Sequence, residues 1–188
     1  MRYDATMFDH AEYASRYDTS ADYLQDQMFT RIGPRARKRG CLTCRDLVEI
    51  GKWKFRGLWV KKHERELRAN RDQAVRTITR IAFSLDGVRA VMLLTALNGV
   101  GVPMASAILT IVLPDRFGVI DVRAWATLYR WKLVTNVKTS FVPDDYGLYL
   151  KIIRRLSNRA NLTPRKVDMA LFAYDDEHRN GPLRLSGR

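Results

Sequence analysis

The apolar residues of the chain recur at the spacing of helices. Intervals of three and four positions run through most of the sequence, and the period-two alternation of a half-buried strand is almost absent. No Asn-Gly or Asp-Gly hairpin signal joins two strand-like runs. The pattern predicts an all-α protein.

Local signals place the ends of the predicted helices. Thr43, followed three residues later by Asp46, is typical of a helix N-terminus. Pro103 fits a first helical turn, where its missing N–H costs nothing. Gly33-Pro34 and Gly40 instead predict a basic loop. The predicted helices cover 43–55, with an end at Gly57, then 58–69, 71–84, 88–97, 103–113, 121–131, 143–155 and 164–174.

The length of 188 residues allows one compact core, or two lobes that share a cleft, but not two large independent domains. We therefore treat residues 1–188 as a single helical unit. Its parts are an acidic N-terminal arm (1–30), a basic helical segment (31–84), a central segment (85–130), C-terminal helices (131–176) and a polar tail (177–188).

Positive charge is concentrated in one part of the chain. Residues 31–80 hold 16 Lys and Arg against 5 Asp and Glu, whereas residues 1–30 hold 2 against 6. The formal net charge of the whole chain is +13. Such a block is the electrostatic footprint of a polyanion partner, although solvated arginine-rich helices would also explain it. We expect nucleic acid as the partner.

Cysteine and histidine are too sparse for the common metal sites. Cys41 and Cys44 form a lone C-x-x-C, which without a second pair cannot build a four-ligand zinc or iron–sulfur site. The three histidines, His10, His63 and His178, have no ligand spacing.

One apolar stretch, Val91 to Leu113, is long enough to span a bilayer. It is broken by two glycines and Pro103, so two short buried helices explain it better than one spanning helix. The N-terminus lacks the basic start and apolar run of a signal peptide. We expect no membrane contact and a cytoplasmic location, nucleoid-associated if the protein is bacterial.

The turn between these two apolar helices is the most informative motif. Gly99 and Gly101, separated by Val100, can adopt backbone angles closed to other residues, so that successive amide N–H groups point outward at a helix N-terminus. The helix dipole adds positive charge there, and this geometry binds a phosphate without reading base sequence. A plain tight turn between core helices is the alternative.

The frame Leu-x-Gly-Val-Gly-x-x-x-Ala-x-x-Ile-Leu, from Leu97 to Leu109, resembles the hairpin of the HhH-GPD superfamily of base-excision DNA glycosylases. A second helix, a proline-containing loop and Val119-Ile120-Asp121 at the head of a helix match as well. The resemblance covers about residues 85–130, and the rest of the chain only through its helical content and size. It implies a helix-hairpin-helix glycosylase-like fold with two helical lobes around a cleft.

The resemblance also implies roles for individual residues. Asp121 stands at the place of the catalytic carboxylate. The hairpin from Gly99 through Val100 and Gly101 to Met104 binds DNA, with the amides of Gly99, Gly101 and Met104 as phosphate ligands. No cofactor is required, but the carbonyls of Thr95, Leu97 and Val100 form a candidate structural site for a monovalent cation.

The chemistry of base removal supports a single carboxylate. Cleavage of an N-glycosidic bond develops positive charge on the deoxyribose, which an ionised carboxylate stabilises while it orients or deprotonates a water. Asp121 also fits the N-cap of the helix that follows it. The two roles are compatible.

A lysine that some superfamily members use is absent from this hairpin. Bifunctional members place it two residues after the Gly-x-Gly, where it forms a Schiff base with the sugar and cuts the strand. This chain has Pro103 there and no lysine between Leu97 and Trp131. We expect a monofunctional enzyme that leaves an abasic site. The two cysteines exclude the iron–sulfur cluster of some relatives.

Aromatic and basic residues alternate near Gly57. Trp53 and Phe55 could stack on an extruded base or wedge the gap it leaves, while Lys54 holds a phosphate. Alternating residues do not share a helix face, so core packing of one aromatic is an equal alternative. Arg123 is a candidate contact to the DNA backbone or to Asp121.

These features predict a monomeric glycosylase that acts on double-stranded DNA. Its substrate is an alkylated, deaminated or bulky modified base, including the hypermodified cytosines of some phage genomes. The alternatives are a non-catalytic helix-hairpin-helix DNA-binding module and a helical RNA-binding or ribosome-associated protein.

Overall fold

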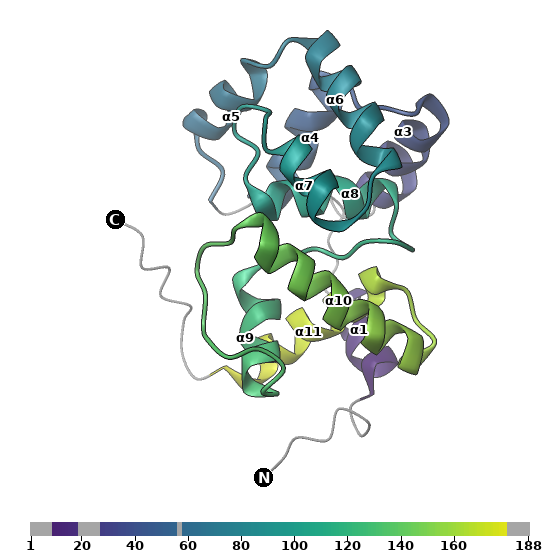
Figure 1. Ribbon diagram of the computed structural model, residues 1–188, viewed down its shortest axis with the longest axis vertical. Helices are drawn as coiled ribbons and strands as arrows, with labels where there is room; N and C mark the ends of the chain where they lie inside the picture. Colours follow the sequence, from purple (N-terminus) through teal and green to yellow (C-terminus); the bar gives the residue numbers. More distant parts are fainter. Residues whose placement is uncertain (1–8, 19–26, 56–57, 180–188) are drawn as a thin grey trace.

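The computed structural model describes residues 9–18, 27–55 and 58–179, and this part of the chain is all-helical, without strands. The predicted all-α class is confirmed. In chain order (Figure 1), its elements are α1 (His10–Asp18), the π-helix η1 (Gln27–Ile32), α3 (Gly33–Arg39), α4 (Cys44–Lys54), α5 (Lys61–Arg68), α6 (Asp72–Ser84), α7 (Gly87–Leu94), α8 (Val102–Val112), α9 (Val122–Arg130), α10 (Pro143–Ala160) and α11 (Pro164–His178).

The helices form two groups, one above the other in Figure 1. The first, which we call the hairpin group, contains η1 and α3 to α8; within it α8 packs against η1, α3, α4 and α7. The second, the α11 group, contains α1, α9 and α10 packed around α11. The two groups meet where α10 packs against α7 and α8.

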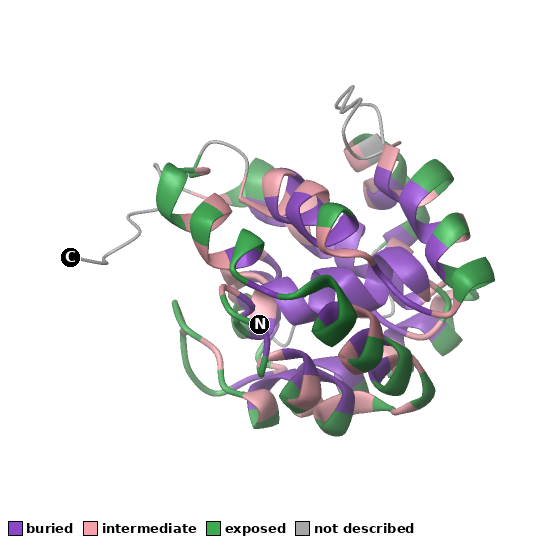
Figure 2. Cartoon of the chain, turned by 90° about the horizontal axis from the view of Figure 1, so that it is seen from above, coloured by how far each residue is buried: buried purple, intermediate pink, exposed green. Residues whose placement is uncertain are grey.

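Helix α8 is the buried centre of the hairpin group. Every residue from Val102 to Val112 except Pro103 is buried, as expected of a helix that is apolar on all sides. Figure 2 shows the same arrangement for the described residues, with buried residues inside and exposed ones on the outer faces. The predicted pair of short apolar helices is confirmed, and no described helix has the length and apolarity needed to cross a bilayer.

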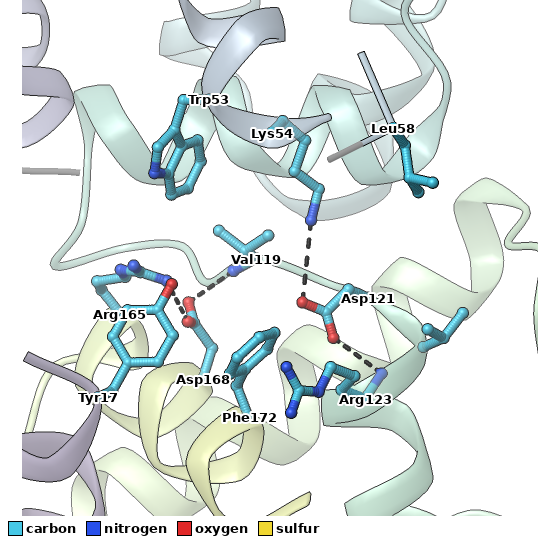
Figure 3. A pocket seen from close by; sticks show the side chains of 11 residues that line it. Tyr17, Trp53, Lys54, Leu58, Val119, Asp121, Arg123, Arg165, Asp168 and Phe172 are labelled. Atoms are coloured by element: carbon cyan, nitrogen blue, oxygen red, sulfur yellow. Dashed lines mark hydrogen bonds and ion pairs between the residues drawn. The ribbon is translucent and has the colours of Figure 1, made fainter. Parts of the chain in front are cut away.

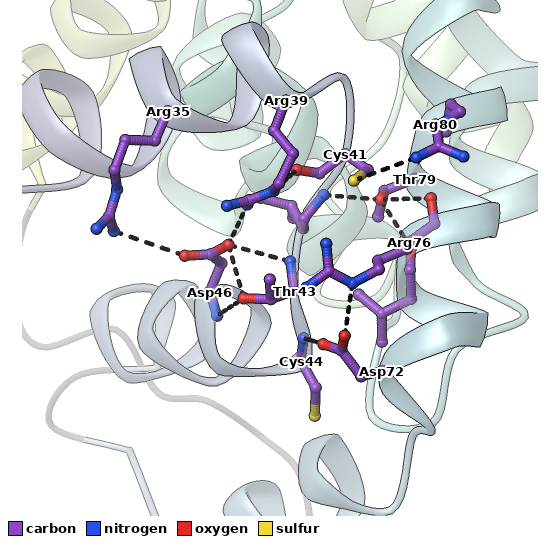
Figure 4. Close-up of polar contacts among 12 residues, drawn as sticks. Arg35, Arg39, Cys41, Thr43, Cys44, Asp46, Asp72, Arg76, Thr79 and Arg80 are labelled. Atoms are coloured by element: carbon purple, nitrogen blue, oxygen red, sulfur yellow. Dashed lines mark hydrogen bonds and ion pairs between the residues drawn. The ribbon is translucent and has the colours of Figure 1, made fainter.

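Hydrogen bonds to several side chains hold the start of α4 in place (Figure 4). Thr43 and Asp46 form the predicted capping box. The N–H of Cys44 donates to Asp72 Oδ1 at 2.7 Å, and the N–H of Leu42 donates to Thr79 Oγ1 at 2.9 Å. These bonds join α4 to α6 and so fix the direction in which α4 carries its last residues, including Lys54.

The prediction of a basic loop between Gly33 and Gly40 is wrong, because these residues bound α3. Pro34 lies in the first turn, and Gly40 ends the helix in the left-handed region at φ 73°. Proline and glycine at these two places mark helix ends as well as loops. Gly33 also lies so close to α8 that a Cβ would meet the carbonyl oxygen of Ile111 at 2.3 Å.

Several predicted boundaries move by a few residues. The helix expected from residue 58 begins at Lys61, because Val60 has an extended backbone. The helix expected to end at 155 continues to Ala160, where Asn161 adopts a left-handed conformation. The last helix continues to His178, into the predicted tail. Gly57, residues 180–188 of the tail, and residues 1–8 and 19–26 of the arm lie outside the described residues.

Candidate functional site

A cavity of about 400 Å³ lies between the two groups of helices (Figure 3). This volume falls within the range of small-molecule sites. Its walls come from α1, α4, the segment that precedes α9, α9 itself and α11. The residues that matter for its chemistry are Trp53, Lys54, Asp121, Arg123, Asp168 and Phe172.

The two carboxylate oxygens of Asp121 have different surroundings. Oδ1 accepts the N–H groups of Arg123 at 3.0 Å and Ala124 at 2.8 Å, so that Asp121 is the N-cap of α9. Oδ2 lies 3.9 Å from Nζ of Lys54 across the cavity. The cap holds the side chain in one orientation and leaves the second oxygen directed at the lysine.

The extended segment before Asp121 is held by buried side chains from three helices. The N–H of Val119 donates to Asp168 Oδ2 at 2.7 Å, and the Tyr149 hydroxyl donates to the carbonyl of Val119 at 2.8 Å. The N–H of Ile120 donates to Ser106 Oγ at 3.1 Å. Ser106 lies on α8, so the helix that follows the Gly-x-Gly turn also positions the carboxylate.

Lys54 lies in the wall of the cavity, and its side chain is only 12% exposed. Burial lowers the pKa of its amine, whereas the charges of Asp121 and Asp168 raise it and that of Arg165 lowers it. Lys52, two residues earlier, instead pairs with Glu49 at 3.0 Å near the surface. Lys54 was predicted as a phosphate contact, and the structure brings it to Asp121.

A buried ion pair borders the same cavity. Arg165 Nη1 donates to Asp168 Oδ1 at 2.5 Å, and its guanidinium lies over the rings of Tyr17 and Phe29, at 5.2 and 4.8 Å from their centroids. Burial raises the pKa of Asp168 to about 7, against the lowering effects of Arg165 and of the Val119 N–H. The carboxyl group of Asp168 therefore binds or releases a proton near neutral pH, next to the candidate site.

Sequence reasoning missed seven of the residues that border this cavity. Three are the apolar Leu58, Val119 and Val122, and the other four are Tyr17 on α1 and Arg165, Asp168 and Phe172 on α11. One signal was present, because Arg165 and Asp168 occupy positions that share the apolar face of α11 with Leu171 and other core residues. A charged pair at such positions indicates a buried ion pair.

Arg123 is engaged with α11. Its guanidinium pairs with Asp175, Nε to Oδ2 at 3.3 Å, and with Asp176, and it lies 3.8 Å from the centroid of the Phe172 ring. Only its backbone N–H contacts the carboxylate of Asp121. Arg123 lines the cavity while joining α9 to α11.

The two aromatic residues near the end of α4, Trp53 and Phe55, have different surroundings. Trp53 is 6% exposed, borders the cavity and contacts the ring of Phe29 edge-on at 6.0 Å. Phe55 stacks on His63 at 4.5 Å and is not among the residues that border the cavity. One aromatic therefore packs in the core at the wall of the site.

Of the two hairpin glycines, only Gly99 has the backbone angles predicted for both, because Gly101 is extended at φ −85° and ψ 177°. Gly99 lies in the left-handed region at φ 74°, and the side chain of Asn70 bonds both the N–H and the carbonyl of Asn98, at 2.9 and 3.0 Å. Within the described chain the N–H groups of Gly99 and Gly101 donate to no acceptor. Met104 lies in the first turn of α8, where amides have no intrahelical partner. The N–H groups of Gly99 and Gly101 therefore keep the hydrogen-bonding capacity that the predicted phosphate contact requires.

The carbonyls proposed for a cation differ in their bonding. Leu97 accepts the N–H of Val100 at 3.1 Å, whereas no described residue donates to the carbonyls of Thr95 and Val100. The carbonyls of Thr95 and Val100 thus have no donor among the described residues, and the cation site at the turn stays a prediction. Among the described residues no cluster of three His, Cys, Asp or Glu could hold a metal ion.

No family model, curated protein or solved structure matches the chain. The function is therefore inferred from the cavity and the hairpin.

The cavity combines groups that suit chemistry on a cationic or carbonyl carbon. An oriented carboxylate stabilises positive charge that develops beside it and accepts a proton from water. A partly desolvated amine is a nucleophile once it is neutral. Aromatic side chains at Trp53 and Phe172 offer flat surfaces to a planar ligand.

Proposed function

We propose that the protein is a monomeric DNA glycosylase of the helix-hairpin-helix type, in which the two groups of helices are lobes around a cleft. The observation that carries the proposal is the position of Asp121. One carboxylate oxygen is locked by the cap of α9, and the other faces a cavity of about 400 Å³ beside aromatic walls. Such a cavity accepts a base extruded from a duplex.

In the proposed reaction the amides of Gly99, Gly101 and Met104 hold a phosphate of the damaged strand, and the extruded base enters the cavity. Asp121 Oδ2 lies beside the deoxyribose and stabilises its positive charge as the N-glycosidic bond breaks. The same carboxylate orients or deprotonates the attacking water. The products are the free base and an abasic site in double-stranded DNA.

The substrates that fit this proposal are alkylated, deaminated or bulky modified bases, including the hypermodified cytosines of some phage genomes. The open, partly apolar lining is compatible with a planar base that carries an added group. Which base is removed depends on the groups that meet its edge.

The Asp121→Asn variant tests the proposal. Asparagine also caps helices, so α9 is preserved while the negative charge is lost. We expect base release to fall by at least about 100-fold, with affinity for DNA retained. The assay incubates the purified chain with normal, alkylated, deaminated and phage-modified genomic DNAs, measures released bases by mass spectrometry and counts abasic sites with an aldehyde probe.

Asp144→Asn is the matched control, because Asp144 is an exposed residue in the first turn of α10. It should release bases at the wild-type rate. Full activity of Asp121→Asn would contradict the role given to this carboxylate. If the wild type binds the DNAs but releases no base from any of them, the result would favour a non-catalytic DNA-binding module in which Asp121 serves only as the cap.

A further inference from the structure

The amine of Lys54 faces Asp121 across the cavity, and the proposed base release does not use it. It is carried by the last residue of α4, on the wall opposite the start of α9 (Figure 3). Four interactions fix the position of α4 and therefore of Lys54. They are the capping box at Thr43, the two hydrogen bonds from backbone N–H groups to the side chains of Asp72 and Thr79 on α6, and the packing of the buried ring of Trp53.

The surroundings of Lys54 differ from those of a lysine that holds a phosphate. Its side chain is 12% exposed, and the groups that face it are the carboxylates of Asp121 and Asp168 and the guanidinium of Arg165. Burial favours the neutral amine, which is the nucleophilic form. At 3.9 Å, a small rotation of the flexible side chain brings the amine within hydrogen-bond reach of Asp121 Oδ2.

An amine and a carboxylate that share one cavity are the equipment for chemistry on an aldehyde. The product of the proposed base release is an abasic deoxyribose, whose ring-opened form carries an aldehyde at C1′. That carbon is formed in the same cavity, beside Asp121. The nucleophile and its electrophile therefore meet without movement of the DNA.

We propose that Lys54 captures C1′ of the abasic deoxyribose as an imine and thereby cleaves the strand. This activity rests on the proposed function for the origin of its substrate, and it departs from the expectation of a monofunctional enzyme. On α8, Pro103 stands where bifunctional members of the superfamily have a lysine, so no amine is present at that place. In this proposal the amine comes instead from Lys54 at the end of α4.

The step balances without an oxidant or a reductant. The neutral amine of Lys54 adds to the C1′ carbonyl, and the hydroxyl of the adduct takes up one proton from solvent and leaves as water, which gives an iminium ion. The later hydrolysis of the iminium returns that proton to solvent. Asp121 accepts a proton from C2′, the electron pair of that C–H bond forms the C2′=C3′ double bond, and the C3′–O bond breaks as the phosphate leaves with its electron pair. Water then hydrolyses the iminium, which returns the amine and releases the unsaturated aldehyde.

The experiment traps the imine. The purified full chain is mixed with a duplex that carries one abasic site, prepared beforehand by enzymatic removal of uracil, in the presence of sodium cyanoborohydride. We expect a covalent protein–DNA adduct, and peptide mapping by mass spectrometry should find the reduced sugar on Lys54. This mapping uses the wild-type chain and does not depend on the folding of a variant.

Lys54→Arg and Lys52→Arg form a matched pair of variants. Arginine keeps the positive charge but cannot form the imine, so Lys54→Arg should lose the adduct while it still binds the abasic duplex. Lys52→Arg, whose lysine pairs with Glu49 outside the cavity, should trap as the wild type does. An adduct mapped to any other residue, or its survival in Lys54→Arg, overturns the proposal.

Because the abasic site is made independently, this test and the test of base release can fail separately. Base release without an adduct, from a chain that binds the abasic duplex, overturns the role of Lys54 and leaves the glycosylase. An adduct on Lys54 without base release from any DNA supports the imine step and overturns the glycosylase.

Discussion

At the scale of single residues, the carboxylate of Asp121 serves two purposes with its two oxygens. Oδ1 completes the N-terminus of α9, and Oδ2 faces Lys54 and the cavity. A helix cap holds a carboxylate more rigidly than a free side chain, because two backbone amides restrict its rotation. The preference for aspartate at a helix N-cap therefore also directs Oδ2 toward Lys54 and the cavity.

The buried carboxyl group of Asp168 titrates near neutral pH. Its pKa is raised from 3.8 to about 7 by burial, so between these values the folded state binds a proton that the unfolded chain releases. Its contribution to the free energy of unfolding therefore falls as pH rises from about 4 to about 7. Above pH 7 this contribution is constant.

The comparison of the wild type with Asp168→Asn by urea unfolding at several pH values checks this titration. The stability of the wild type relative to the variant should decrease from pH 4 to pH 7 and then level off. Asp144→Asn, at an exposed position, serves as the control. An increase in relative stability over the same range would mean that Arg165 holds Asp168 ionised.

At the scale of secondary-structure elements, the turn between α7 and α8 joins two functions. It exposes the amides of Gly99 and Gly101, and it starts the helix whose Ser106 holds the segment before Asp121. In the proposed function, phosphate contact and placement of the carboxylate would therefore both depend on the buried helix α8. The two glycines contribute differently, because only Gly99 has a positive φ.

Substitution of each hairpin glycine by alanine separates these contributions. Gly99→Ala forces a left-handed residue with a side chain and places its Cβ 3.1 Å from Leu67 Cδ2, so we expect a loss of about 1–2 kcal/mol in the free energy of unfolding. Gly101 has φ −85° and its added Cβ would meet no atom closer than Pro103 Cδ at 4.0 Å. Gly101→Ala should therefore stay within about 0.5 kcal/mol of the wild type. Equal losses in urea unfolding would show that the positive φ is not what makes Gly99 necessary.

At the scale of the whole molecule, charge is distributed unevenly between the two groups of helices. Residues 31–80, which carry a net charge of +11, contribute the last two residues of η1, all of α3, α4 and α5, and most of α6 to the hairpin group. The exposed amides of the hairpin belong to the same group. In the proposed function, a duplex bound to this group would meet both the positive charge and the candidate phosphate-binding turn.

Binding to double-stranded DNA should therefore depend strongly on salt. If two or more phosphates are neutralised, the affinity falls by at least about tenfold between roughly 50 and 200 mM monovalent salt. Fluorescence anisotropy with a labelled duplex measures the slope, and single-stranded RNA is the competitor. A flat salt dependence would argue against phosphate binding, and stronger competition by the RNA would support the RNA-binding alternative.

The sequence by itself determined the all-helical class, the capping box at Thr43, the pair of short apolar helices and the cap at Asp121. These features depend on contacts within a turn or two of the chain, which periodicity and capping residues report directly. The α3 helix was mistaken for a loop because proline and glycine punctuate both. Only the tertiary structure brought Lys54, Asp168 and Arg165 to the carboxylate. The positions of Arg165 and Asp168 on an apolar helix face indicate that they are buried, but which distant helix packs over them has no local signal in the sequence.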